Sequence, residues 1–158
     1  MAPTRITLLF ASLKDQKKKD MIAYITAGDP CPERIPALIE ALEKGGADLI
    51  ELGVPFSDPI ADGPVIQRGG ERALRAGTSM RTVLEIARKI RTSSEIPLLL
   101  FTYLNPVVRY DLEALAAAGC DLVFVPAATA MYASGFSTFV EPPAVSQPLE
   151  GICREGHF

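Results

Sequence analysis

The sequence is poor in histidine and cysteine, the usual ligands of zinc. It contains one histidine, His157, and three cysteines, Cys31, Cys120 and Cys153, which are far apart and form no CxxC pair. This pattern argues against a zinc site and for a reducing cytosol. We therefore expect no metal, and any catalysis has to depend on carboxylates, hydroxyls or backbone groups.

Long apolar runs and blocks of like charge are also absent. No apolar run reaches the roughly 18 residues of a membrane span, and the first 16 residues are charged too often for a secretory signal. The net charge is −3 with both signs interspersed, which gives no basic surface for nucleic acid. We expect one cytoplasmic domain that binds neither membranes nor nucleic acid.

What the chain does have is an alternation of short apolar runs with segments of helical periodicity. Strands are expected at residues 21–26, 48–54, 96–104 and 121–125, and helices at 6–13, 35–42, 65–76, 80–87 and 112–118. This order predicts an α/β protein with a parallel sheet. An open doubly wound sheet and a (β/α)8 barrel both fit the pattern.

The length limits how much of a barrel the chain can form. Residues 1–126 would supply about four βα units, half of a barrel that normally needs roughly 250 residues. Residues 127–158 are rich in proline, glycine and serine and predict an irregular tail with at most one short strand, at 136–140. The fold expected is a partial (β/α)8 TIM barrel followed by this tail.

The stretch ELGVPFSDPIADGP, residues 51–64, places carboxylates around the end of an expected strand. Side chains alternate along a strand, so Ile50, Leu52 and Val54 share one face and Glu51 has the other. In a barrel Glu51 would line the interior near the carboxyl end of the strand, where barrel active sites form. Burial there should raise its pKa and make it a general acid. The alternative is a buried carboxyl satisfied by a neighbouring amide.

A second carboxylate, Asp62, follows in the loop after this strand, far enough along to fold back over the strand end. Two carboxylates in different surroundings suit a reaction that needs both an acid and a base. The alternative is that Asp58 and Asp62 are only turn residues before proline or glycine. The cost of burying an unpaired carboxylate favours a functional role.

The run LIELGVPFSDPIADGPVIQ closely resembles the signature of the tryptophan synthase alpha chain family. The resemblance continues in YITAGDP, LRAGTS and FTYLNPVVRY and covers about residues 5–110. It implies a (β/α)8-barrel lyase of tryptophan biosynthesis, which cleaves indole-3-glycerol phosphate into indole and glyceraldehyde 3-phosphate by a retro-aldol reaction. It also implies that no metal or organic cofactor takes part.

The resemblance assigns roles to four residues. Glu51 matches the general acid/base that protonates C3 of the indole ring, and Asp62 matches the carboxylate that partners the ring N–H. Tyr24 and Tyr103 match positions that line the indole pocket, although packing in the core would explain each of them equally well.

The resemblance also implies a protein partner. One loop matches the part that faces the tryptophan synthase beta chain in an alpha2-beta2 type assembly, and it consists of Pro55, Phe56, Ser57 and Asp58. A non-catalytic half barrel that docks on the beta chain through this loop is the alternative function.

The family pattern is expected to stop near Tyr110. Residues 111–158 resemble an internal fragment of pantothenate synthetase, the pantoate–beta-alanine ligase. The paired histidines and the lysine-bearing nucleotide motif of that family are absent, so pantothenate synthesis is not the expected activity. The sequence thus predicts a chimeric and truncated chain.

Truncation has two expected consequences. No segment after Asn105 offers a strand, a glycine-rich turn and then a helix to hold a phosphate, so we expect negligible cleavage by this chain alone. A half barrel also leaves sheet edges and an apolar inner face open, which favours self-association. The pattern gives no reason for Gly69 and Gly70 inside an expected helix.

Overall fold

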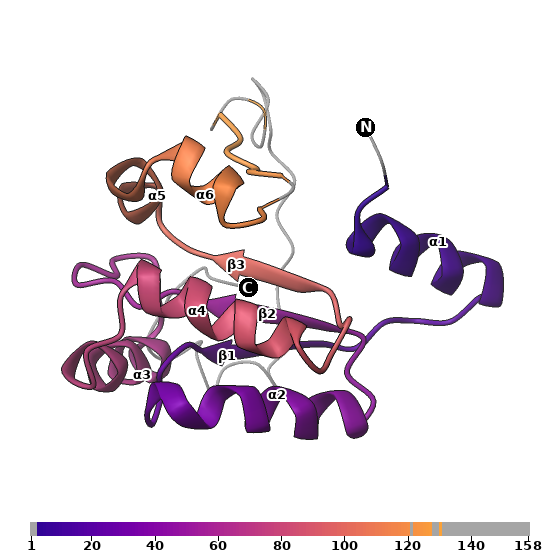
Figure 1. Ribbon diagram of the computed structural model, residues 1–158, viewed down its shortest axis with the longest axis horizontal. Helices are drawn as coiled ribbons and strands as arrows, with labels where there is room; N and C mark the ends of the chain where they lie inside the picture. The colour runs from indigo at the N-terminus through magenta and orange to yellow at the C-terminus, as the bar shows by residue number, and fades with distance from the viewer. Residues whose placement is uncertain (1–2, 121, 128–129, 131–158) are drawn as a thin grey trace, which may run out of the picture.

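A computed structural model describes residues 3–120, 122–127 and 130 of the chain. This part contains three parallel strands in the order β1-β2-β3 (Figure 1). The strands are β1 (Ile22–Thr26), β2 (Leu49–Gly53) and β3 (Leu98–Phe101). The helices are α1 (Arg5–Gln16), η1 (Pro32–Arg34), α2 (Ile35–Lys44), α3 (Pro64–Arg75), α4 (Met80–Arg91), α5 (Leu104–Tyr110) and α6 (Leu112–Ala117).

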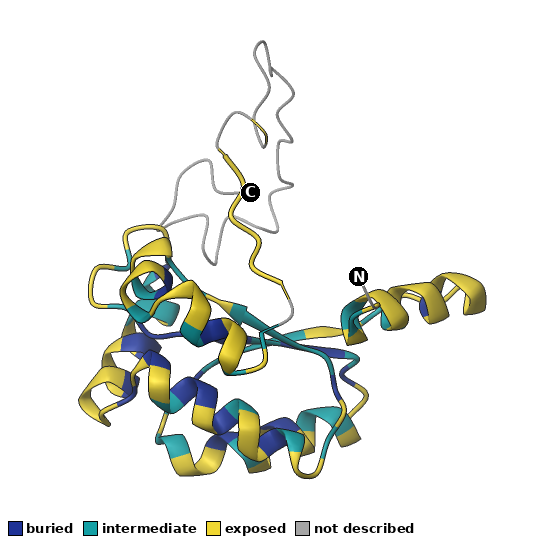
Figure 2. Cartoon of the chain, turned by 45° about the horizontal axis from the view of Figure 1, so that its top comes forward, coloured by how far each residue is buried: buried dark blue, intermediate teal, exposed yellow. Residues whose placement is uncertain are grey.

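One face of the sheet is covered by helices α2 and α4. The core between these layers contains fully buried side chains from β2, α2 and α4, namely Ile50, Leu52, Ile35, Ile39 and Val83. Figure 2 shows the buried positions on the strands and on the sides of the helices that face them. Parallel strands joined by helices on one side are the arrangement of successive βα units in a barrel.

Side chains alternate between the two faces of the sheet as predicted. The register pairs Tyr24 with Glu51 and Glu51 with Leu99. Because Ile50 and Leu52 on the same strand are buried against the helices, Glu51 and its two partners lie on the opposite face. The prediction that the Ile50 face meets the helices is therefore confirmed.

The predicted helices are present, and local signals set their ends. Helix α4 begins where the Ser79 hydroxyl accepts a hydrogen bond from the Thr82 N–H, an N-cap interaction. Helix α2 ends at Lys44, and the following Gly46 adopts a positive φ of 101°, a conformation that glycine tolerates best. Residue types at these helix ends thus fit the positions where the helices begin and stop.

The fourth strand predicted at 121–125 is wrong. Residues 122–127 form no strand, and Leu122 and Phe124 are 70% and 77% exposed. An apolar run becomes a strand only where a neighbouring strand supplies its hydrogen-bond partners, and composition cannot show that. The sheet of the described residues therefore has three strands rather than four. The strand predicted at 136–140 lies outside the described residues.

The third strand is shorter than predicted because an unpredicted helix, α5, begins at Leu104. Pro106 lies in the first turn of α5, where a backbone N–H has no helical partner and proline is tolerated. The apolar run 96–104 therefore divides between a strand and the start of a helix.

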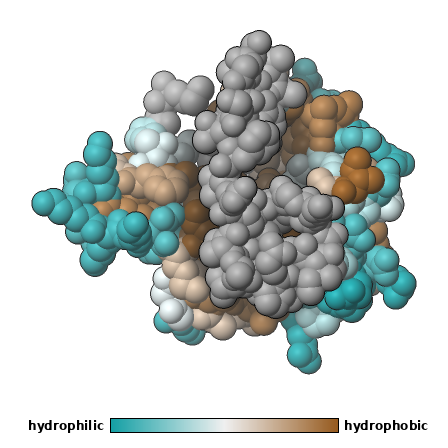
Figure 3. Space-filling view, turned by 180° about the vertical axis from the view of Figure 1, so that it is seen from behind, coloured by the Kyte–Doolittle hydropathy of each residue, from teal (hydrophilic) through white to brown (hydrophobic). Residues whose placement is uncertain are grey.

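Helix α1 lies beyond the amino ends of the strands, away from α3 and α5 at the carboxyl ends (Figure 1). Arg5 Nε donates to Glu95 Oε2 at 2.6 Å and ties α1 to the segment before β3. The outer surface of helix α1 is largely hydrophilic (Figure 3). None of the helices within the described ranges is long and apolar enough to cross a membrane.

Candidate active site at the carboxyl ends of the strands

The loops that follow the three strands begin side by side. Ala27 N–H donates to the Gly53 carbonyl at 2.8 Å, and Val54 N–H donates to the Phe101 carbonyl at 2.9 Å. The hydrogen-bond pattern of the sheet therefore continues one residue into the loops after β1 and β2. These hydrogen bonds fix the position of Val54, where the loop that carries Asp62 begins.

Glu51 lies in the middle of β2, half-buried, on the face that α2 and α4 do not cover. The ring of Tyr24 extends across Gly53 on this face, since a Cβ at Gly53 would lie 2.1 Å from Tyr24 Oη. Tyr24 and Phe101 meet edge to face, with ring centroids 6.3 Å apart. Glycine at position 53 is thus required for this aromatic contact over β2.

The pKa of the Tyr24 hydroxyl depends on the charges around it. Burial raises the pKa of its hydroxyl, and the negative charges of Asp62 and Glu51 raise it further, against a lowering hydrogen bond with Thr26. The phenol therefore keeps its proton at neutral pH. Both carboxylates lie near enough to act on one hydroxyl, so the structure brings Tyr24, Glu51 and Asp62 together.

Tyr103 follows β3 and contacts the loop that carries Asp62. Its hydroxyl accepts a hydrogen bond from the Ala61 N–H at 2.8 Å, and its ring lies 5.0 Å from that of Phe56. Burial raises the pKa of the Tyr103 hydroxyl, and Asp62 adds to the rise. Tyr103 is therefore adjacent to the loop rather than packed only in the core.

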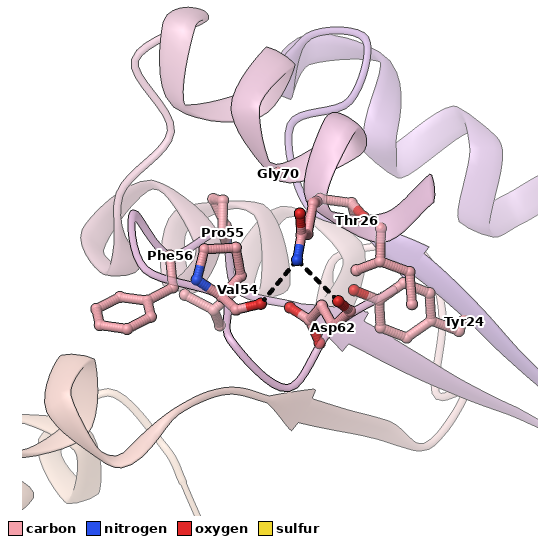
Figure 4. A pocket seen from close by; sticks show the side chains of 10 residues that line it. Tyr24, Thr26, Val54, Pro55, Phe56, Asp62 and Gly70 are labelled. Atoms are coloured by element: carbon pink, nitrogen blue, oxygen red, sulfur yellow. Dashed lines mark hydrogen bonds between the residues drawn. The ribbon is translucent and has the colours of Figure 1, made fainter. Parts of the chain in front are cut away.

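A small pocket lies between β1, this loop and α3. Its volume is about 10 Å³, enough for one water molecule. Figure 4 shows Tyr24 and Asp62 next to each other at this pocket, with Thr26 and Gly70. Sequence reasoning missed Thr26, although it lies two residues after Tyr24 and so on the same face. It also missed Gln67, the last residue of the signature run, which lines the pocket as well.

A second polar contact joins the loop after β1 to α3. Arg72 donates two hydrogen bonds to the Asp29 carboxylate, at 2.8 and 2.7 Å, and these bonds lower the pKa of Asp29. A Cβ at Gly69 would lie 3.2 Å from both Asp29 Oδ2 and Thr26 Oγ1. Close approach of α3 to this loop thus explains Gly69, which the sequence left unexplained.

The predicted partner loop lies at one side of a wide cleft of about 900 Å³. Pro55, Phe56 and Ser57 line this cleft, while Asp58 is exposed and its carbonyl accepts from the Ile60 N–H at 3.0 Å. The other lining residues come from the α3–α4 region and from α5, namely Leu74, Ser79, Met80, Arg81, Leu104, Asn105, Pro106, Val108, Arg109 and Tyr110. Hydrophobic atoms are exposed over α5 and α6 (Figure 3).

Glu51 lies in the middle of β2 rather than near its carboxyl end as predicted, and Asp62 lies in the loop beyond that end. Parallel βα units with such groups on and after a strand are typical of α/β barrel-type proteins, whose sites lie at the carboxyl ends of the strands. The family model of the tryptophan synthase alpha chain matches residues 10–140. The chain belongs to that family.

Individual relatives agree with the family model. The chain is 55% identical to the tryptophan synthase alpha chain of Solibacter usitatus over 166 residues, which cover 96% of this chain and 62% of the relative. It is 51% identical to that of Geotalea uraniireducens, over 77% of this chain and 47% of the relative. The chain thus spans about half the length of the curated relatives it matches.

Solved structures show the same fold. The tryptophan synthase alpha subunit of Legionella pneumophila str. Paris matches with a TM-score of 0.72 and 43% identity, over 76% of this chain and 48% of that one. A tryptophan synthase structure from Mycobacterium tuberculosis matches with a TM-score of 0.68 and 38% identity, over 75% and 47%. The predicted partial TIM barrel is confirmed.

The family match also bears on the predicted limit near Tyr110. Because the match runs to residue 140, the tryptophan synthase alpha pattern extends beyond that limit. The resemblance of residues 111–158 to pantothenate synthetase stays a prediction.

Proposed function

We propose that this chain carries the acid–base part of a lyase site that cleaves indole-3-glycerol phosphate into indole and glyceraldehyde 3-phosphate. The observation that carries the proposal is the half-buried Glu51 on the sheet face without helices, with Tyr24 and Asp62 beside it. A carboxyl group placed beside a bound ligand can act as a general acid and general base.

In the proposed reaction Glu51 gives its proton to C3 of the indole ring. The bond between C3 and the glycerol chain then breaks, and its electron pair returns to the ring. The hydroxyl on the chain carbon that was bonded to C3 gives its proton to the Glu51 carboxylate and becomes the aldehyde, which restores the protonated Glu51. The Asp62 carboxylate accepts a hydrogen bond from the ring N–H and stabilises the positive charge that the ring carries after protonation.

The aromatic side chains support a planar ligand. Tyr24 and Phe101 form a surface around Gly53, and flat rings pack well against such groups. The pocket beside Asp62 has the volume of about one water molecule, so only the N–H edge of a ring would enter it. Tyr103 would border the ring from the loop after β3.

The proposal includes docking on a tryptophan synthase beta chain at the cleft beside Pro55, Phe56 and Ser57. The cleft is largely apolar and carries Arg81 and Arg109, which suits a partner with apolar and acidic side chains. If docking occurs without cleavage, the chain is the non-catalytic module instead. A cytoplasmic location belongs to the same proposal.

An indole-release assay tests the proposed chemistry. The chain is assayed alone and mixed with the segment of the Solibacter usitatus relative that it does not match, expressed separately. We expect Glu51→Gln to lower indole formation in the mixture by about 100-fold or more. Glu85→Gln, at an exposed position of α4, is the matched control and should leave it unchanged. Equal turnover in Glu51→Gln and the control would contradict the proposal.

Co-purification with a tryptophan synthase beta chain tests the docking. Val108→Asp places a charge on an exposed residue of the cleft, and Leu8→Asp makes the same change on exposed α1. We expect the first variant to lose binding and the second to keep it. Light scattering on the chain alone measures self-association, which stays a prediction; a stable monomer would contradict it.

A further inference from the structure

The loop between β2 and α3 is joined to α3 by one side chain. Helix α3 begins at Pro64, and its N-cap residue, Gly63, makes no side-chain capping bond. Instead Gln67 Nε2 donates to the Asp62 carbonyl at 2.9 Å and to the Pro59 carbonyl at 3.2 Å (dashed lines in Figure 4). A side chain of the helix therefore joins the helix to the loop that precedes it.

These two hydrogen bonds join both ends of a turn. The Asp62 N–H donates to the Pro59 carbonyl at 3.1 Å, so Gln67 binds the two carbonyls that begin and end this turn. From the other side, the Tyr103 hydroxyl accepts from the Ala61 N–H. The main chain of Asp62 is thus fixed at its own N–H, at its own carbonyl and at the preceding N–H.

We propose that Gln67 is a positioning residue that fixes the main chain of Asp62 and, through it, the place of the Asp62 carboxylate. Its importance for cleavage rests on the proposed function. Glutamine suits this position because its amide nitrogen has two hydrogens for two carbonyl oxygens. A glutamate of the same shape would place an acceptor against two acceptors.

Amide hydrogen exchange on the chain alone tests the positioning role without any activity. In Gln67→Met and Gln67→Glu, we expect the Asp62 amide to exchange at least about tenfold faster than in the wild type. The Leu52 amide, in the buried strand β2, reports whether the variant is folded and should not change. Gln16→Met is the matched control, since the Gln16 amide bonds only the Ser12 hydroxyl on exposed α1.

Two results would overturn the assignment. One is an Asp62 amide that keeps its protection in both variants. The other is faster exchange at Leu52 to the same extent, because Gln67 would then support the whole fold rather than one turn. Local loss of protection at Asp62 with Leu52 unchanged supports the proposal.

The indole-release mixture then links the turn to catalysis. We expect Gln67→Met to lower kcat by about tenfold and to change KM by less than about threefold, because misplacing a catalytic group mainly affects the transition state. Lost protection with unchanged kcat would show that the position of the Asp62 main chain does not limit cleavage. If the Gln67 variants lose protection at Asp62 but the wild-type mixture forms no indole, the positioning role of Gln67 stands and the proposed function is contradicted.

Discussion

The two faces of the same three strands carry different kinds of side chain. On the helix-covered face, Ile50 and Leu52 are fully buried among aliphatic neighbours. On the other face, Tyr24 and Glu51 are half-buried, and the Tyr24 ring lies over the buried Gly53. Because neighbouring residues of one strand serve opposite faces, stability and chemistry are separated by a single step along the chain. Substitutions one residue apart should therefore have separable effects.

The largest effect is expected on the helix-covered face. Leu52→Ala should lower the free energy of unfolding by about 2–5 kcal/mol, because it leaves a cavity in a fully buried position. Urea unfolding followed by circular dichroism measures this loss. Leu38→Ala, at a position of α2 that is 41% exposed, is the control and should cost much less. Equal losses would mean that the core is elsewhere.

A smaller loss is expected from Gly53→Ala on the opposite face. The added methyl group would meet the Tyr24 hydroxyl, and such overpacking costs about 1–3 kcal/mol. Gly70→Ala should be neutral or stabilising, because no atom lies within 4 Å of its added Cβ and helices favour alanine. In the double variant with Tyr24→Ala the cost of Gly53→Ala should fall. Additive losses would show that the two side chains do not meet.

The contribution of Tyr24 to the free energy of unfolding should depend on pH in the alkaline range. Folding raises the pKa of Tyr24, so the folded state holds this proton more tightly than the unfolded state. Its contribution to stability is fully present below the ordinary tyrosine pKa of about 10 and is lost as pH rises through the raised value. Urea unfolding at pH 8 and pH 11 should show a smaller alkaline loss for Tyr24→Phe than for the wild type. Identical losses would place Tyr24 in water.

The smallest effect on stability is expected from Glu51→Gln, which keeps the shape of a half-buried side chain. The free energy of unfolding should change by less than about 0.5 kcal/mol. Leu52→Ala and Glu51→Gln change adjacent residues and give the sharpest comparison. The first should lower stability, and the second should lower indole release. A loss as large as that of Leu52→Ala would show that both faces serve stability.

Much of the fold could be predicted from periodicity. The spacing of apolar residues in 35–42 and 80–87 gave helices α2 and α4, and alternation in β2 gave the face of Ile50. The segment 121–125 had the same apolar character and forms no strand, since strand formation depends on a partner. Helix α5 was missed because its first residue, Leu104, ends the apolar run 96–104 that predicted a strand.

The candidate site was predictable only in part. Glu51 and Asp62 stood out as carboxylates in and after an apolar strand, and Tyr24 came from the family resemblance. Gln67 and Gly69 gave no such signal, because what they do depends on carbonyls and side chains of other segments. Contacts between segments leave no periodic trace in the sequence.

The sequence by itself determined the family, every described α-helix except α5 and the side of the sheet on which Glu51 lies. These depend on the order of residue types and on the repeat of helix and strand, which are local properties. Only the tertiary structure decided which carbonyls Gln67 holds, why position 53 has no side chain and where the sheet stops. Each of these depends on groups that folding brings together from separate parts of the chain.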